Sequence, residues 1–239
     1  MRVHPSESDT QERILRTFTV LHSLREDWGG ALIIACSLCQ EGGALALASN
    51  IAGAVCLSIE NDPAKVKDAL RSGSCDFIVN TLDEALRAMK NEVRKHLPLS
   101  VGLQANPTQV LQEILERGVA PELFTDLTGN SASPKAIQSF KSTGALIVHF
   151  DSTHTISDEE SLDANSILNT FIHDRQWLLH SFSFDTQAAL RAFDAHALTL
   201  LPEDDLLRRR WLQAAPKILQ RERPIRRVLW VTEHEKQQI

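Results

Sequence analysis

The side chains of this sequence that could do chemistry lie at the ends of successive apolar runs. Gly42 and Gly43 follow the run that ends at Cys36, and Glu60 ends the next run. A glycine turn before a helix lets the backbone approach a diphosphate, and an acid at a strand end can accept hydrogen bonds from ribose hydroxyls. This order predicts a nucleotide-binding βαβ unit. The polar residues near the ends of the later runs are Asn80, Gln104, Asn106, Asp126, Thr128, Asn130, His149 and Asp151.

Each candidate also has a purely structural interpretation. The two glycines would equally allow close packing between a helix and a strand. Lys65, five residues after Glu60, could reach an adenine ring or a phosphate, or it could be an ordinary lysine on a helix surface. Asn106 and Asp126 could cap helices or turns. Their convergence on one sheet edge favours function modestly, and the residues alone leave both interpretations open.

The cysteines and histidines form no recognisable catalytic or metal motif. Cys36 and Cys39 have CxxC spacing, but Cys36 closes a strand and Cys39 lies in the turn, whereas a redox pair needs its first cysteine at a helix N-terminus. A structural role is favoured. The sequence has no second CxxC and no paired HxxxH, so we expect no metal site. It also has no P-loop, GxSxG or HExxH motif, and it identifies no catalytic residue.

Alternating strands and helices must position these residues. A helix is expected over residues 9–28, where apolar residues recur at helical spacing. Continuous apolar strands alternating with helices predict an α/β, Rossmann-like, doubly wound and mostly parallel sheet with helices on both faces. The expected strands are 31–36, 54–59, 75–79, 99–103, 122–125 and 145–150. The expected helices between them are 43–52, 62–72, 82–96, 108–117 and 134–142.

The regular alternation weakens after residue 151. Helices are expected over 161–177, 186–195 and 203–220, and a last strand over 227–232 that joins the same sheet. We therefore divide the chain into an N-terminal helix (1–29), a Rossmann-like domain (30–150) and a mostly helical C-terminal extension (151–239). We expect the extension to pack on the same domain.

The composition narrows the classes of partner. The chain has 239 residues, 43% of them hydrophobic, and a formal net charge of −6, which disfavours broad binding of nucleic acid. The basic residues 208–210 and 221–227 are interleaved with acids and indicate a solvated or interface surface. The N-terminus has no apolar signal region, and no apolar run approaches about 18 residues, so we expect neither export nor a membrane span. With four cysteines expected to be reduced, a cytoplasmic location is predicted.

Three ordered segments resemble urocanase (urocanate hydratase), specifically its Rossmann-like NAD-binding domain. Residues 42–65, GGALALASNIAGAVCLSIENDPAK, resemble the family's GGAQPLAATMAGA and VEVDPAR segments. Residues 99–106, LSVGLQAN, resemble ISIGLLGN, and residues 117–126, RGVAPELFTD, resemble RGVxPDxVTD. The similarity runs from about residue 30 to residue 133.

The resemblance implies tightly bound NAD, whose nicotinamide acts as an electrophile toward urocanate before water is added. It implies a backbone contact from Gly42 to the cofactor, a ribose contact from Glu60, and a cofactor contact from Asn106. Lys65 stands where the family has an arginine near the adenine. The complete predicted cofactor set is Gly42, Gly43, Glu60, Lys65, Asn106, Asp126 and Thr128.

The chain also departs from the family. The glycine-rich turn GGMGG becomes CQEGG at residues 39–43, so Gln40 and Glu41 add bulk and negative charge where a diphosphate would approach. The motif QTSAHDP becomes LTGNSAS at residues 127–133, without its glutamine and histidine. The flanking regions that form the family's catalytic core are absent, and the chain is less than half a urocanase. Complete hydratase activity is therefore not expected.

Three hypotheses follow. The first is a stand-alone urocanase-like domain that binds NAD or a related nucleotide. The second is a divergent hydratase or lyase, in which Asp126, His149 and Asp151 act as acid–base groups and the extension or a partner chain supplies the rest. The third is a scaffold with a decayed pocket, which Gln40 or Glu41 would fill. A homo-oligomer or a partner protein is one prediction, because a domain separated from a larger enzyme exposes a former interface; the alternative is that the C-terminal helices cover that surface.

Overall fold

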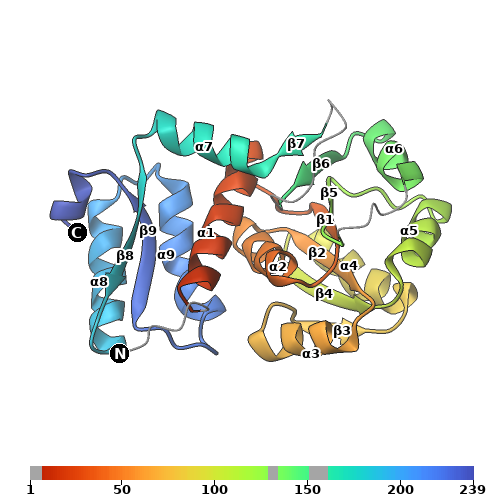
Figure 1. Cartoon of the computed structure of the whole chain (residues 1–239), viewed down its shortest axis with the longest axis horizontal. Coiled ribbons are helices and arrows are strands. Elements are labelled where there is room, and N and C mark those ends of the chain that lie inside the picture. The colour runs from red at the N-terminus through yellow and green to blue at the C-terminus, as the bar shows by residue number, and fades with distance from the viewer. Residues whose placement is uncertain (1–6, 129–133, 151–160) are drawn as a thin grey trace.

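A seven-stranded sheet forms the centre of the computed structural model, which describes residues 7–128, 134–150 and 161–239. Its strand order is β3-β4-β2-β1-β5-β6-β7, and every neighbouring pair runs parallel (Figure 1). The predicted Rossmann-like parallel sheet is confirmed. Its strands are β1 (Leu32–Cys36), β2 (Val55–Glu60), β3 (Phe77–Val79), β4 (Leu99–Gln104), β5 (Leu123–Asp126), β6 (Leu146–His149) and β7 (Leu162–Asp163).

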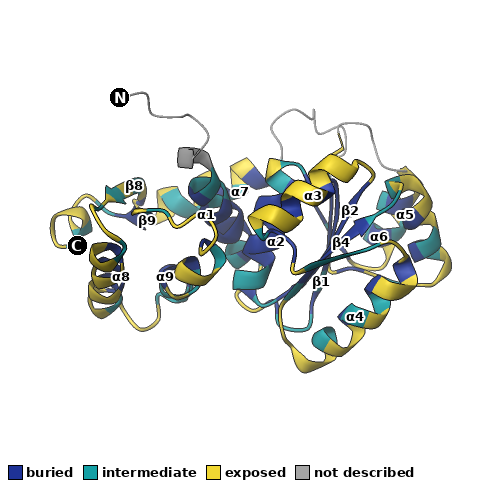
Figure 2. Cartoon of the chain, turned by 90° about the horizontal axis from the view of Figure 1, so that it is seen from below, coloured by how far each residue is buried: buried dark blue, intermediate teal, exposed yellow. Residues whose placement is uncertain are grey.

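Alternate residues of each strand face two different helix layers, as expected for a sheet buried on both sides. Ile33 and Cys56 join an apolar cluster with α2, whereas Ile34 and Leu57 join a cluster with α4, α5 and α6. Figure 2 shows α2 and α3 on one side of the sheet and α4 and α5 on the other. The helices are α2 (Gln40–Ala52), α3 (Pro63–Ser72), α4 (Leu82–Lys95), α5 (Pro107–Glu116) and α6 (Pro134–Ser142).

Local capping residues start these helices where the sequence predicts. The Asp62 carboxylate accepts a hydrogen bond from the N–H of Ala64, at 2.8 Å, just before Pro63. Thr81 and Glu84 form a complete capping box at the start of α4. Gly73 ends α3 in the left-handed conformation, at φ 86°, which glycine adopts without a steric penalty.

The first helix, α1 (Glu7–Leu24), is buried along most of its length. It packs against α2, and its residues Ile14, Leu15, Phe18 and Leu21 are fully buried. A single apolar cluster contains these residues together with residues of β1, α2 and the C-terminal strand β9 (Arg226–Val231). Helix α1 is therefore shared between the sheet and the C-terminal part of the chain (Figure 1).

The C-terminal part forms a separate layer, which corrects one expectation. Strand β9 does not join the main sheet; it pairs antiparallel with β8 (Leu178–Ser183), a strand that the sequence analysis did not anticipate. The segment expected as one helix over 161–177 instead contains β7 and α7 (Ala164–Asp174). The remaining elements are α8 (Gln187–Leu200), α9 (Leu206–Ile218) and a short 3₁₀ helix over Glu235–Gln237.

Hydrogen bonds of buried polar side chains fix β9 against its neighbours. The indole N–H of Trp230 donates to the hydroxyl of Thr19 in α1, at 2.8 Å, and the indole N–H of Trp211 donates to the carbonyl of Val228, at 2.7 Å. Gln11 of α1 also bonds the β9 backbone. No helix among the described residues is long and apolar enough to cross a membrane.

Replacing Thr19 by valine tests this junction. The change keeps the side-chain shape but leaves the buried Trp230 N–H without its acceptor, so we expect a loss of about 1–3 kcal/mol in the free energy of unfolding, measured by urea denaturation. Thr170→Val, on the exposed face of α7, is the matched control and should change stability by less than about 0.5 kcal/mol. Equal effects of the two variants would show that the junction contributes nothing specific.

Candidate functional site

The turn between β1 and α2 begins with a serine in a conformation that favours glycine. Ser37 has φ 95°, in the left-handed region. Cys39 then caps α2 without a side-chain hydrogen bond. The turn therefore adopts a backbone conformation typical of glycine-rich loops, although Ser37 and Cys39 are not glycines.

Gly42 is required for packing. A Cβ atom on Gly42 would lie 2.2 Å from the carbonyl oxygen of Ser37. Ser37, Cys39 and Gly42 also have the spacing of the three glycines of G-x-G-x-x-G, of which the first makes the turn, the second lets the backbone approach a diphosphate, and the third lets helix and strand pack closely. Gly42 matches the third, and Cys39 stands at the second.

The Glu60 carboxylate holds this turn in place. Its Oε2 accepts hydrogen bonds from the Ser37 hydroxyl and the Leu38 N–H, both at 2.9 Å, and its Oε1 accepts one from the Asp62 N–H, also at 2.9 Å. The Lys65 ammonium lies 3.7 Å from Oε2. Burial would raise the pKa of Glu60, but these donors and the Lys65 charge outweigh it and lower the pKa below its ordinary value.

The cysteines at the turn are structural. Cys36 is fully buried, and burial together with the nearby Asp126 and Glu60 charges raises the pKa of its thiol. Burial also raises the pKa of the Cys39 thiol. Neither thiol is therefore a ready nucleophile at neutral pH. No group of three or more metal-ligating side chains occurs in the part of the chain that the structure describes.

A cleft of about 450 Å³ opens beside the first turn of α2, between α2, α3 and the end of α9; we call it the α2–α3 cleft. Gly43 and Lys65 line it, whereas Gly42 does not. Its apolar wall contains Leu38, Ala44, Leu47, Ala69, Ile218 and Leu219. Its polar lining contains the cations Arg13 and Lys65, the acids Asp68 and Glu222, and the uncharged Thr10, Gln40, Ser72 and Ser74.

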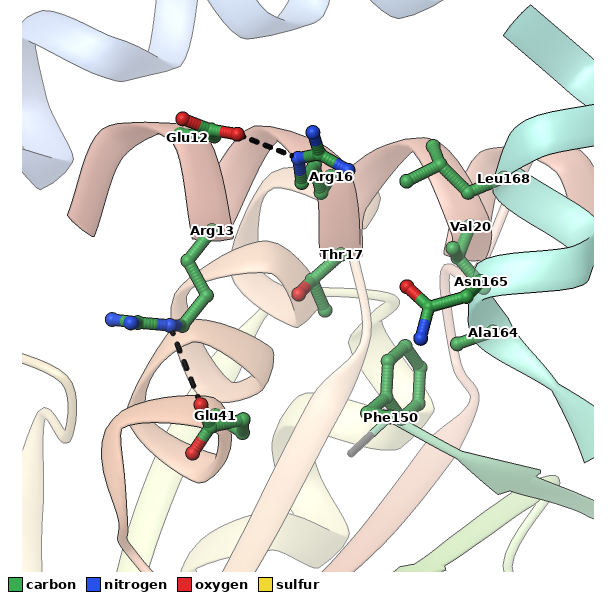
Figure 3. Close-up of a pocket in the computed structure, with 10 residues that line it drawn as sticks. All are labelled: Glu12, Arg13, Arg16, Thr17, Val20, Glu41, Phe150, Ala164, Asn165 and Leu168. Carbon is green, nitrogen blue, oxygen red and sulfur yellow. Dashed lines mark hydrogen bonds and ion pairs between the residues drawn. The ribbon is translucent and has the colours of Figure 1, made fainter. Parts of the chain in front are cut away.

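Glu41 is held by Arg13. The Glu41 carboxylate lies 3.5 Å from Nε of Arg13 on α1 (Figure 3). Glu41 lines a second cleft, of about 260 Å³, between α1 and α7, which we call the α1–α7 cleft. The structure therefore gives Glu41 a cationic neighbour, which offsets the negative charge that the sequence places near the turn.

A model of the urocanase Rossmann-like domain matches residues 10–137 of the chain. This chain belongs to the urocanase family. The match covers α1, the sheet through β5 and the start of α6, and it includes the turn, Glu60 and Lys65.

Solved structures with a similar chain path have low sequence identity. A domain assigned as the enoyl reductase of a polyketide synthase is 17% identical, with a TM-score of 0.37, and the match covers 80% of this chain and 98% of that chain. AibC is 14% identical, with a TM-score of 0.35, covering 77% and 55%. A short-chain alcohol dehydrogenase from E. coli CFT073, complexed with NADH, is 13% identical, with a TM-score of 0.37, covering 85% and 59%.

The remaining predicted residues of this urocanase-family domain lie at the same sheet edge but have local partners. The Asn106 side chain accepts a hydrogen bond from the Gln109 N–H, at 3.2 Å, and caps α5. Asp126 accepts hydrogen bonds from the N–H and the hydroxyl of Thr128, at 3.0 and 2.7 Å. Cys36 on β1 is paired with Asp126 on β5, and Glu60 with Gln104. Glu60 and Lys65 are brought into direct contact.

The acid–base candidates are only partly described. His149 ends β6 and is the register partner of Asp163 on the neighbouring strand β7. Asn130 and Asp151 lie outside the described residues.

Two residues were missed by sequence reasoning. Ser37 could have been found by aligning G-x-G-x-x-G to Ser37, Cys39 and Gly42 instead of to the visible glycines. Arg13 carries no local signal, because it reaches the turn only through the packing of α1 on α2.

Adjacent glycines provide a matched test of the packing role. Gly42→Ala should destabilise the protein by about 1–3 kcal/mol, because its Cβ would meet a backbone oxygen that cannot rotate away. At Gly43 the nearest atom is the Ser74 hydroxyl oxygen, 3.0 Å from a Cβ, which is a tight contact, but a side-chain hydroxyl can shift by a few tenths of an ångström, so Gly43→Ala should cost clearly less than Gly42→Ala. Urea denaturation compares the two, and an equal effect would contradict the assignment.

The Glu60 network predicts a specific pH dependence. Because the folded state lowers the Glu60 pKa, its stabilisation is fully present above the ordinary value of 4.5 and is lost as the pH falls through the folded-state pKa. Glu60→Gln should therefore cost about 1–3 kcal/mol at neutral pH, and this cost should shrink below pH 4.5 in urea denaturation series. Glu203→Gln, at an exposed site, is the control; a cost independent of pH would contradict the role of the charge.

Proposed function

We propose that this urocanase-family domain binds NAD or a related nucleotide in the α2–α3 cleft and does not carry out the complete urocanate hydratase reaction. The observation that carries the proposal is the position of Gly43 and Lys65 in one cleft beside the first turn of α2. Family membership supports the same class of ligand.

The phosphate end of the ligand has suitable donors. The first N–H groups of a helix have no partner within that helix, and the helix dipole favours negative charge there. Cys39, Gln40 and Gly43 bring this first turn to the cleft. Its two cations, Arg13 and Lys65, are balanced by the lining acids Asp68 and Glu222, so the helix N-terminus and Lys65 rather than net charge would have to hold the phosphate. Cys39 adds a side chain where the fingerprint has its second glycine, so the ligand sits farther from the backbone and binds less tightly than in a full fingerprint.

Glu60 retains room for one further donor. A carboxylate oxygen accepts two hydrogen bonds, and Oε1 accepts only the Asp62 N–H among the described residues. One ribose hydroxyl matches this capacity; Glu60 itself is 6% exposed and does not line the α2–α3 cleft. When bound, NAD would supply an electrophilic nicotinamide ring; the side chains described here would bind and orient the nucleotide.

The open cleft favours binding over a purely structural scaffold. A decayed pocket would be filled by Gln40 or Glu41, but Gln40 lines a cleft of about 450 Å³ and Glu41 is paired with Arg13. The hydratase alternative has weaker support, because Asp126 is engaged by Thr128 and the family's glutamine and histidine are absent after β5.

The location and partners are part of the proposal. Cys36, Cys39, Cys56 and Cys75 are free thiols, which suits a reducing cytoplasm. A homo-oligomer or a partner protein would complete the surface that a full-length urocanase covers with its other regions.

Lys65→Gln tests the nucleotide site. We expect the affinity for NAD, measured by isothermal titration calorimetry, to fall about tenfold because one charge-assisted phosphate contact is lost. Lys67→Gln, an exposed lysine on the same helix that does not line the cleft, should leave the affinity unchanged.

Two outcomes would overturn the proposal. Folded wild-type protein that binds neither NAD nor ADP at ~1 mM would remove the nucleotide ligand. A steady loss of urocanate ultraviolet absorbance with the purified chain would show that the hydratase reaction is complete after all.

A further inference from the structure

The C-terminal layer contains a cleft with an excess of positive charge. This α8–α9 cleft, of about 340 Å³, lies between the first half of α8, the end of α9 and the turn before β9. It is formed entirely by residues outside the 10–137 segment that matches the urocanase domain. The lining contains Arg191, Arg223 and Arg227 but only one acid, Asp194.

Charge distinguishes this cleft from the two clefts described above. The α1–α7 cleft contains Arg13 and Arg16 beside Glu12 and Glu41, and each arginine is paired with one of these acids. In the α2–α3 cleft two cations face two acids. In the α8–α9 cleft, three arginines and one aspartate leave two positive charges that the lining does not neutralise.

The single acid is already committed to the cleft floor. Arg227 is 1% exposed, and it donates from Nε and Nη2 to the two oxygens of Asp194, at 2.8 and 2.7 Å. Gln11 accepts from a third Arg227 nitrogen, at 3.4 Å. This bidentate ion pair forms a fixed, buried floor of the cleft. Asp194 is therefore not available to neutralise a second arginine.

The other two arginines of the lining differ from Arg227 in exposure and in pairing. Arg191 and Arg223 are exposed, and neither side chain forms a hydrogen bond or an ion pair with any residue that the structure describes. Arg223 has φ 47°, a conformation that costs energy for a residue other than glycine. The Gln187 side chain fixes this turn by donating to the carbonyls of Arg223 and Pro224, at 2.8 and 2.6 Å.

We propose that the α8–α9 cleft binds a small phosphate monoester, with Arg191 and Arg223 on the phosphate and an apolar group against the cleft wall. Guanidinium groups bind phosphate oxygens in a fork geometry, and two of them match the charge of a phosphate dianion. Leu190, Pro216 and Leu219 supply apolar surface next to the arginines. This site is independent of the nucleotide proposed for the α2–α3 cleft.

Phenyl phosphate is a suitable probe, because it combines the dianion with a small apolar ring. Titration of the full chain by calorimetry should give a Kd below ~1 mM, with inorganic phosphate weaker and phenol without measurable binding. Amide resonances of Leu190 and Gln220 should shift during the titration in nitrogen-15 NMR spectra.

Three variants locate the site. Arg191→Gln and Arg223→Gln should each weaken phenyl phosphate binding about tenfold, since each removes one forked contact from an exposed position. Arg87→Gln removes the same charge from an exposed position on α4 and should leave the affinity unchanged. Circular dichroism verifies that the variants fold.

Three results would contradict the proposed phosphate site in the α8–α9 cleft. Absence of saturable binding up to ~10 mM would remove it. If Arg87→Gln weakened phenyl phosphate binding equally, the effect would reflect the net charge of the protein and not this cleft. If Lys65→Gln abolished binding, the phosphate would bind in the α2–α3 cleft instead. Retention of phenyl phosphate binding together with failure to bind NAD would leave this site standing without the nucleotide site.

Discussion

The burial of α1 between two apolar layers is the constraint on which the rest of the structure depends. One cluster joins α1 to α2 and the sheet and also to α9 and β9. Buried polar groups must be hydrogen-bonded, so Gln11 and Thr19 set the register of α1 against β9 through the β9 backbone and Trp230. The same register brings Arg13 to Glu41 and makes α1 a wall of two clefts.

The turn after β1 shows how the chain keeps a glycine-rich geometry without the usual glycines. Ser37 bears the cost of a left-handed backbone, and its hydroxyl and the following N–H are both bound by Glu60. Gly42 is needed for close packing, because the Ser37 carbonyl oxygen occupies the space where a Cβ atom would lie. Glu60 therefore stabilises the turn in the absence of a ligand. Only the hydrogen-bonding capacity of its carboxylate that the turn does not use is left for a ribose hydroxyl.

The sequence predicts well what depends on local periodicity and capping. The helix over 134–142 has the expected bounds, and α3, α4 and α5 begin within one residue of their predicted starts, each at a capping side chain (Asp62, Thr81 and Asn106). The sequence does not predict strand pairing between distant segments. Strands β8 and β9 pair although two helices separate them along the chain, and β9 was expected in the main sheet. The same difference between local and long-range contacts applies to the candidate site. Glu60 and Lys65 belong to one βα unit and could be paired from the sequence, whereas Arg13 reaches Glu41 only through the packing of α1 on α2.

A preformed turn changes what a ligand must do. Since Glu60, Asp62 and Leu38 are already connected, binding does not have to order the loop, and the free energy of phosphate contacts is not spent on that ordering. The Cys39 side chain acts in the opposite direction, by keeping the ligand away from the helix N–H groups. The affinity of this domain for a nucleotide therefore depends on whether preorganisation outweighs the lost close approach. Nucleotide affinity is thus set by the geometry of the β1–α2 turn, whereas binding in the α8–α9 cleft is proposed to depend on the charge of its arginines.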